Sequence, residues 1–306
     1  MENLERVSDI TTFNDIFDLA RAKENTTVAV AAAASAYVMK AAAEASRLGI
    51  AKMILVGCAA KMEEVAAQEG LDLSVFEIVD EADNFAACRT AVRLVVEGRA
   101  TALMKGDVDT SSIMRAALDR ENGMRDGKKL SHIAAFEPEH YHKLLFVSDC
   151  AINIAPDGDT KIEIIENCVR ALHSIGIEKP KVALLAAKEV VDEKMPITAT
   201  WAGLVTLHKT SDRMNGCIID GPLALDNAVS KDACEIKGIN SPVGGDADVL
   251  IVPDIEAGNI LYKSLSFITK AKNGGVVVGA KRPIILTSRA DTAESKLISI
   301  ALSVLF

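Results

Sequence analysis

Short apolar runs alternate with amphipathic segments along almost the whole chain. The runs at residues 26–33 and 52–57 are typical of buried strands, and the amphipathic stretch at 37–49 predicts a helix between them. The same pattern predicts further strands at 75–80, 101–106, 181–187, 216–221 and 248–254, and helices within 81–98 and at 59–70, 111–122, 161–176, 197–210, 258–272 and 292–305. This alternation predicts an α/β fold in which a mostly parallel sheet is covered by helices on both faces.

The alternation is interrupted near residues 125–155. Two strand-like runs, "SHIAAFEP" and "KLLFVSDCAINI", follow each other there without a helix between them, so they can pair antiparallel. The runs "GGVVVGA" and "RPIILTS" are also consecutive, and they precede a closing helix where Asp291 and Glu294 have capping-box spacing. We therefore predict two doubly wound α/β domains with a cleft between them. The pattern does not assign the last strands to either domain.

Charge and composition narrow the class of protein. Acidic residues outnumber basic ones, 43 to 34, and the net charge of −9 argues against nucleic acid as the main partner. The N-terminus has no apolar core typical of a signal peptide, and the longest apolar stretch, residues 28–39, is too short to span a membrane. The six cysteines lie far apart with no metal-ligand spacing, which favours buried thiols in a reducing compartment. These features predict a soluble cytoplasmic protein without a metal site.

Polar side chains gather where predicted strands end. Lys105 closes one strand, and Thr110 and Ser111 precede the next helix. A lysine, hydroxyls and the N–H groups of a helix N-terminus together form a candidate anion site. The alternative is that Thr110 or Ser111 only caps the helix.

Two later strand ends carry further candidates. Asp220 and Asp254 each end a strand, and Asn259 and Lys263 follow Asp254 on the helix predicted to open at residue 258. Loops at the carboxyl ends of parallel strands commonly hold ligands. The Gly-Pro and Asp-Asn pairs after Asp220 are also common in plain turns.

The segment "PIILTSRADTAESK", residues 283–296, places Thr287, Ser288 and Arg289 where an apolar strand meets a helix. A guanidinium matches phosphate geometry, and a helix start adds partial positive charge, so this junction is a candidate site for a phosphate-bearing group. The alternative is a surface arginine paired with Asp291. The chain has neither a Gly-x-Gly-x-x-Gly loop nor a Gly-x-Ser-x-Gly nucleophile elbow.

Several segments resemble the phosphate acetyl/butyryl transferase family. "DGPLALDNAVS", "KGINSPVGGDADVLIVPDIEAGNILYKSL" and "GAKRPIILTSRAD" are its most specific matches, and "VAVAAA", "ILVG", "LMKG", "LSH", "NIAPD" and "KVALLAAKE" follow the family in the same order. The resemblance covers essentially the whole chain and is closest to the members that transfer butyryl groups.

The resemblance implies a reaction and a fold. The reaction is a reversible transfer, in which acyl-CoA and inorganic phosphate give acyl phosphate and CoA. The fold implied is two α/β domains with the site in the cleft between them, related to the isocitrate and isopropylmalate dehydrogenases. The last strand and helix then return to the first domain, so the predicted domains are 1–128 plus 277–306, and 129–276. Relatives are homodimers or larger homo-oligomers, and the reaction requires no metal or cofactor beyond CoA as substrate.

The resemblance also implies roles for residues. Ser288 and Arg289 stabilise the transition state, and Ser288 lies near the attacking thiol. In acetyl-transferring relatives an aspartate a few residues later is the proposed base, but the corresponding position here is Ser295, so we predict Asp291 as the base. The predicted substrate-binding residues are Lys105, Thr110, Ser111, Asp220, Asp254, Asn259, Lys263 and Thr287.

Three alternatives remain at this stage. One is a phosphate acetyltransferase, since butyryl preference is inferred from "LTSRAD" and "DGPLALDNA" and not from pocket residues. A second is a metal- and NAD-dependent hydroxy-acid dehydrogenase on the related fold. A third is a module that binds CoA or acyl phosphate without catalysis.

Overall fold

A computed structural model describes residues 10–288 and 291–306 of the protein. The chain forms two compact units. Residues 14–128 and 273–306 make the first, which we call the terminal unit, and residues 129–272, with 10–13, make the second, which we call the middle unit. No helix in the described ranges has both the length and the apolar character needed to cross a bilayer.

The terminal unit is built on a mostly parallel sheet. Its strands lie in the order β3 (Glu77–Asp80), β2 (Lys52–Gly57), β1 (Thr27–Ala31), β4 (Ala102–Lys105), β11 (Ile284–Ile285) and β10 (Lys272–Val278). Neighbouring strands are parallel from β3 to β11, and β10 runs antiparallel to β11. Because β11 pairs with β4, the end of the chain completes a sheet that begins near its start.

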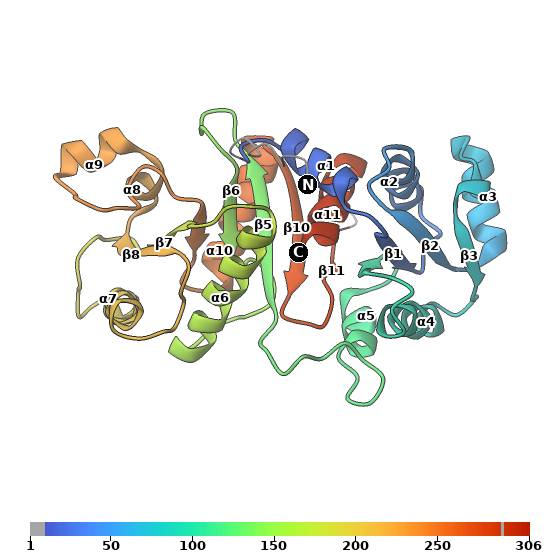
Figure 1. The fold of residues 1–306 in the computed structure, drawn as a ribbon, viewed down its shortest axis with the longest axis horizontal. Helices are drawn as coiled ribbons and strands as arrows, with labels where there is room; N and C mark the ends of the chain where they lie inside the picture. Colours follow the sequence, from blue (N-terminus) through green and yellow to red (C-terminus); the bar gives the residue numbers. More distant parts are fainter. Residues whose placement is uncertain (1–9, 289–290) are drawn as a thin grey trace, which may run out of the picture. The chain divides into compact units, whose positions relative to one another are not determined.

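Helices cover both faces of this sheet, as the α/β pattern predicts (Figure 1). Figure 1 shows α2 (Ala36–Arg47) and α11 (Ala293–Leu305) on one side and α4 (Asn84–Val96) and α5 (Thr110–Ala117) on the other. The unit also contains α1 (Phe13–Ala22), α3 (Ala59–Glu69) and the 3-10 turn η1 (Leu73–Val75). Strands β1 and β4 are almost fully buried because helices pack on each side of them.

The middle unit has strand order β5 (Ser131–Glu137), β6 (Leu145–Ser148), β9 (Val249–Ile251), β7 (Lys181–Leu185) and β8 (Ile218–Leu223). The predicted antiparallel pairing of β5 and β6 is confirmed, and the remaining pairs are parallel. Its helices are α6 (Gly158–Ser174), α7 (Pro196–Thr210), α8 (Leu225–Val229), α9 (Lys231–Lys237), α10 (Ile255–Lys263) and the π-helix η2 (Ser264–Ile268). The α/β class predicted from the sequence is therefore confirmed.

One predicted helix start and one predicted helix cap are wrong. Helix α10 begins at Ile255, not at residue 258, because Asp254 caps it by accepting the Ala257 N–H at 2.9 Å. Gly258 lies inside the helix, and it is a glycine because a Cβ there would come within 2.3 Å of the Asp149 carbonyl oxygen. Helix α11 is capped by Thr292, which accepts the Ser295 N–H, so Asp291 and Glu294 form no capping box.

Candidate functional site

The carboxyl ends of β1, β4 and β11 meet at a small pocket in the terminal unit. It has a volume of about 270 Å³ and we call it the corner pocket. The loop after β4 is held against the end of β1 by hydrogen bonds from Gly106 N to Ala31 O, 2.8 Å, and from Asp107 N to Ala32 O, 2.7 Å. A Cβ on Gly106 would lie 2.2 Å from Ala32 O, so only glycine permits this approach. The lining residues are Ala34, Ser35, Tyr37, Val38, Lys105, Gly106, Asp107, Thr287, Ser288 and Lys296.

Three of the residues predicted from the sequence line this pocket: Lys105, Thr287 and Ser288. Lys105 is buried, and its Nζ donates a hydrogen bond to Val108 O at 3.1 Å. Thr287 is 6% exposed, and its Oγ1 has no hydrogen-bond partner among the described residues. A buried hydroxyl without a partner costs about 1–3 kcal/mol. A hydrogen bond from a ligand in the pocket to Thr287 Oγ1 would remove this cost.

Two hydrogen bonds join Ser288 and Asp291. The Ser288 N–H donates to Asp291 Oδ2 at 2.6 Å, and the Asp291 N–H donates to Ser288 O at 3.2 Å. Arg289, which lies between them, is outside the described residues. The predicted surface pairing of Arg289 with Asp291 and its predicted catalytic role both stay predictions.

Sequence reasoning did not identify Lys296, which lines the same pocket from the first turns of α11. Its side chain is 3% exposed, and its Nζ donates to Ser288 O at 3.0 Å and to Asp291 O at 2.7 Å. Burial lowers the pKa of Lys296, the charge of Asp291 raises it, and the charge of Lys105 lowers it further. A lysine at the start of an amphipathic helix normally faces solvent, so this burial is not visible in the sequence.

The N-terminus of α2 also opens on the corner pocket. Ser35 is the N-cap residue, its side chain makes no capping hydrogen bond, and the first turn of α2 contains no acidic residue. The partial positive charge of a helix N-terminus favours an anion. The pocket also contains the exposed, negatively charged carboxylate of Asp107. The positive charge of two ammonium groups and of this helix end exceeds that negative charge, and an unpartnered hydroxyl adds a hydrogen-bond donor, so the pocket is suited to a small anion.

Thr110 and Ser111 do not line the corner pocket. Asp109, not Thr110 or Ser111, caps α5: its Oδ1 accepts the Ser112 N–H at 2.8 Å, and Ser111 Oγ donates to the same carboxylate. These hydrogen bonds from Ser111 and Ser112 hold the pKa of Asp109 well below its ordinary value. Because a carboxylate already occupies this helix end, it is less favourable for an anion than the end of α2.

The other predicted site residues belong to the middle unit. Asp220 lies in β8, where its Oδ1 accepts the N–H of Gly221 at 2.9 Å. Asp254 is the cap of α10, Asn259 Nδ2 donates to Cys150 O at 3.4 Å, and Lys263 is the last residue of α10, not part of its first turns. Their roles in substrate binding stay predictions.

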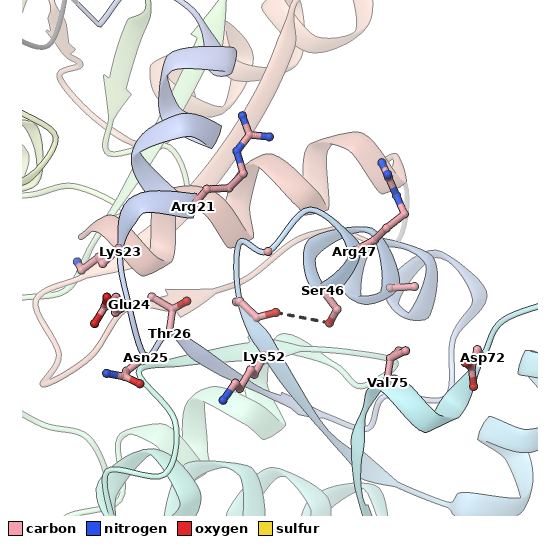
Figure 2. A pocket seen from close by; sticks show the side chains of 13 residues that line it. Arg21, Lys23, Glu24, Asn25, Thr26, Ser46, Arg47, Lys52, Asp72 and Val75 are labelled. Atoms are coloured by element: carbon pink, nitrogen blue, oxygen red, sulfur yellow. Dashed lines mark hydrogen bonds between the residues drawn. The ribbon is translucent and has the colours of Figure 1, made fainter.

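A larger hollow of about 820 Å³ in the terminal unit is lined by Arg21, Lys23, Arg47 and Lys52 among others (Figure 2). Its two arginines are already paired, Arg21 with Asp18 and Arg47 with Glu44. The hollow lies at the amino ends of β1 and β2, whereas ligands of α/β folds bind at the carboxyl ends. Among the residues described, none form a cluster of three or more His, Cys, Asp or Glu suited to a metal ion.

Comparison with solved structures gives the class of fold. A branched-chain phosphotransacylase from Enterococcus faecalis V583 superimposes with a TM-score of 0.81 and 33% identity, over 92% of this chain and 98% of that one. A 4-hydroxythreonine-4-phosphate dehydrogenase from Klebsiella pneumoniae matches with a TM-score of 0.56 and 15% identity, over 91% and 98% of the two chains. At that identity the second match shows a shared fold alone. The predicted dehydrogenase-like fold is confirmed, while the dehydrogenase activity considered as an alternative is not favoured.

Sequence comparison gives the family. A family model described as phosphate acetyl/butaryl transferase matches residues 11–87 and 84–304. A phosphate butyryltransferase from Clostridium acetobutylicum is 45% identical over 97% of this chain and 98% of its own length. A phosphate acetyltransferase from Rhizobium meliloti is 40% identical over 96% and 93%. The chain belongs to the phosphate acetyl/butyryl transferase family, as its sequence motifs predict.

Proposed function

We propose that the protein transfers a short acyl group, preferably butyryl, between CoA and inorganic phosphate. Family membership over nearly the whole chain carries this proposal. The corner pocket supports this proposal, because the reaction needs a site for a phosphate group. Polar side chains converge in this pocket at the carboxyl ends of strands, where α/β folds usually bind ligands. CoA is a substrate in this reaction, and no further cofactor takes part.

In the direction of acyl-CoA synthesis, the CoA sulfur attacks the carbonyl carbon of the acyl phosphate in a ternary complex. A carbon–sulfur bond forms, the carbon–oxygen bond to phosphate breaks, and phosphate leaves with the electron pair. The tetrahedral transition state places negative charge on the carbonyl oxygen. The Ser288 hydroxyl and the Arg289 guanidinium stabilise this charge, an effect worth about 2.7–4 kcal/mol for one well-placed donor.

Asp291 accepts the proton of the CoA thiol in this scheme. A free thiol has a pKa of about 8.5, so a carboxylate base increases the reactive thiolate at neutral pH. Oδ2 of Asp291 accepts the Ser288 N–H, which fixes the carboxylate beside the serine that lies near the thiol.

The remaining predicted residues contact the substrates. Lys105 and Thr287 contact the phosphate-bearing group. The predicted roles of the others are in binding CoA and the acyl group, and these residues are Thr110, Ser111, Asp220, Asp254, Asn259 and Lys263. We further propose that the enzyme works in the cytoplasm as a homodimer or larger homo-oligomer.

Acyl preference separates the butyryl proposal from the acetyl alternative. One methylene group is worth about 1–3 kcal/mol in a fitted pocket, so the two additional methylene groups of butyryl permit a preference of about tenfold or more with little change in pocket shape. The 45% identity to a butyryltransferase and 40% to an acetyltransferase differ too little to decide the matter alone.

The test is an assay of thiol release from acetyl-, propionyl- and butyryl-CoA with and without phosphate. We expect phosphate-dependent release that is fastest with butyryl-CoA. Fastest release with acetyl-CoA would assign the acetyl alternative, and release without phosphate would indicate a thioesterase. Ligand-induced thermal stabilisation without any turnover would indicate a binding module instead of an enzyme.

A further inference from the structure

We propose that Lys296 positions Ser288 and Asp291 relative to each other and that the phosphate group of the substrate binds its remaining N–H. The role in catalysis rests on the proposed function. The binding of a phosphate dianion in the corner pocket can be measured without it.

The charge of Lys296 is buried without an acidic partner in direct contact. In the described part of the chain, its ammonium group makes no ion pair with any carboxylate, and its hydrogen bonds go to two neutral carbonyl oxygens. A buried charge that is not paired destabilises the folded protein. An anion in the pocket that Lys296 lines would supply the missing opposite charge.

The hydrogen-bonding capacity of Lys296 leads to the same conclusion. An ammonium group has three N–H donors. Ser288 O takes one and Asp291 O takes another, leaving one donor for a ligand. Charge-assisted hydrogen bonds to phosphate oxygens are roughly twice as strong as neutral ones.

The two carbonyls bound by Lys296 belong to Ser288 and Asp291. Lys296 therefore fixes the positions of Ser288 and Asp291 relative to each other. A phosphate that binds the same ammonium group would therefore link the presence of a ligand in the pocket to the position of Ser288. Lys296 acts through these neighbours, so it is a positioning residue as well as a ligand for the anion.

Two further groups complete a cradle for phosphate. The Oγ1 of Thr287 is buried and has no partner in the described residues, and the uncapped N-terminus of α2 at Ser35 lines the same pocket. Lys296, Thr287 and the helix end come from two segments distant in sequence. Each lacks one interaction that a tetrahedral dianion can provide.

The experiment compares Lys296→Met, Lys296→Gln and the surface control Lys61→Met in the full-length protein. Inorganic phosphate alone should raise the melting temperature of wild type and Lys61→Met, and this shift should be lost in Lys296→Met. The KM for phosphate should rise about tenfold or more in Lys296→Met, since about 1.4 kcal/mol of binding corresponds to tenfold. The KM for butyryl-CoA should change less than about twofold, because that substrate carries no group in this cradle.

The glutamine variant separates positioning from charge. Gln can still donate a hydrogen bond to the carbonyl of Ser288 or of Asp291, so Lys296→Gln should retain more of kcat than Lys296→Met. Its KM for phosphate should stay as high as in Lys296→Met. The proposal would be overturned if folded Lys296→Met showed the same phosphate-induced rise in melting temperature as wild type. An equal rise in the KM for phosphate and the KM for butyryl-CoA would also overturn it.

If Lys296→Met does not fold, Lys296→Arg and Lys296→Gln decide the matter. If phosphate raises the melting temperature of Lys296→Arg but not that of Lys296→Gln, the charge of Lys296 binds phosphate. An equal rise in both variants would overturn the proposal. The outcome is independent of turnover. A wild-type protein that shows a phosphate shift dependent on Lys296 but transfers no acyl group would refute the proposed function and leave the phosphate site in place.

Discussion

The carboxylate of Asp291 accepts the backbone N–H of Ser288 at 2.6 Å, and the backbone N–H of Asp291 donates back to the Ser288 carbonyl at 3.2 Å. This reciprocal contact holds Asp291 against Ser288, which lines the corner pocket. One carboxylate oxygen therefore has a structural task, and the other can accept a proton. The two tasks can be separated because asparagine performs only the first.

Replacing Asp291 with Asn tests its role as a base. The Asn oxygen can still accept the Ser288 N–H, but an amide cannot take the thiol proton. We expect turnover to fall about 100-fold at neutral pH, the usual contribution of a general base. The loss should shrink as the pH rises through about 8.5, where the thiol ionises by itself.

The measurement is the pH profile of thiol-dependent turnover for wild type, Asp291→Asn and Asp291→Ala. If Asp291 only holds Ser288 in place, Asp291→Asn should work nearly as well as wild type at every pH. In that case only Asp291→Ala would be impaired, and the base would have to be sought elsewhere.

Replacing Arg289 with Ala should lower kcat about 100-fold or more if its charge is used at the transition state. Arg282 is an exposed arginine of the same unit, so Arg282→Ala serves as the matched control. Steady-state kinetics with butyryl-CoA and phosphate give the comparison. A wild-type kcat in Arg289→Ala would show that its charge is not used at the transition state and would favour the alternative of a surface arginine paired with Asp291.

Replacing Thr287 with Val should separate stability from binding. Val has nearly the shape of Thr without the hydroxyl that is buried and unpartnered. We expect the free energy of unfolding in urea to stay equal or to rise by about 1 kcal/mol, because an unsatisfied polar group is removed. The KM for phosphate should rise, while Thr287→Ser should keep it near wild type. A destabilised Thr287→Val with unchanged KM would contradict a role in binding.

A charged cluster in the middle unit should govern stability without affecting catalysis. Asp246 accepts hydrogen bonds from His142 Nε2 at 2.7 Å and from the Nζ atoms of Lys143 and Lys181 at 2.9 and 2.5 Å. Burial by itself would raise the pKa of Asp246, but the hydrogen bonds from Lys181, Lys143 and His142 together lower it well below 3.8.

A carboxyl whose folded pKa is depressed stabilises the protein above its unfolded pKa and loses that effect as the pH falls toward the folded value. Asp246→Asn should therefore lower the free energy of unfolding by about 2 kcal/mol at pH 7, in line with hydrogen bonds to charged groups. The difference from wild type should narrow below about pH 4. Urea titrations at both pH values measure it, with exposed Asp212→Asn as the control. An equal loss of unfolding free energy at pH 7 and below about pH 4 would show that the negative charge of Asp246 is not the source of the stabilisation.

The sequence predicted most strands because they are buried on both faces, and a continuous apolar run identifies such a strand without its neighbours. Predicted and observed bounds of β2 agree, Lys52 to Gly57. The helices α8 and α9 were not predicted, since the segment after Gly221-Pro222 has the composition of a turn.

Lys105, Thr287 and Ser288 could be predicted because polar residues at strand ends are visible in the sequence. Lys296 could not, since helix α11 is buried from Lys296 to Leu305 and its polar positions do not mark a solvent-facing side. Capping of α5 by Thr110 or Ser111, the alternative considered for these residues, is wrong. Asp109, Thr110 and Ser111 are adjacent good caps, and only the backbone geometry selects Asp109.

The pairing of β11 with β4 has a consequence during biosynthesis. The corner pocket needs both Ser35 and Thr287, so it forms only after Thr287 has been synthesised, long after Ser35. The middle unit is synthesised earlier and can fold while the ribosome is still adding residues. A chain released before Thr287 is added would therefore lack the corner pocket, and proteolysis that removes α11 would take Lys296 out of its lining.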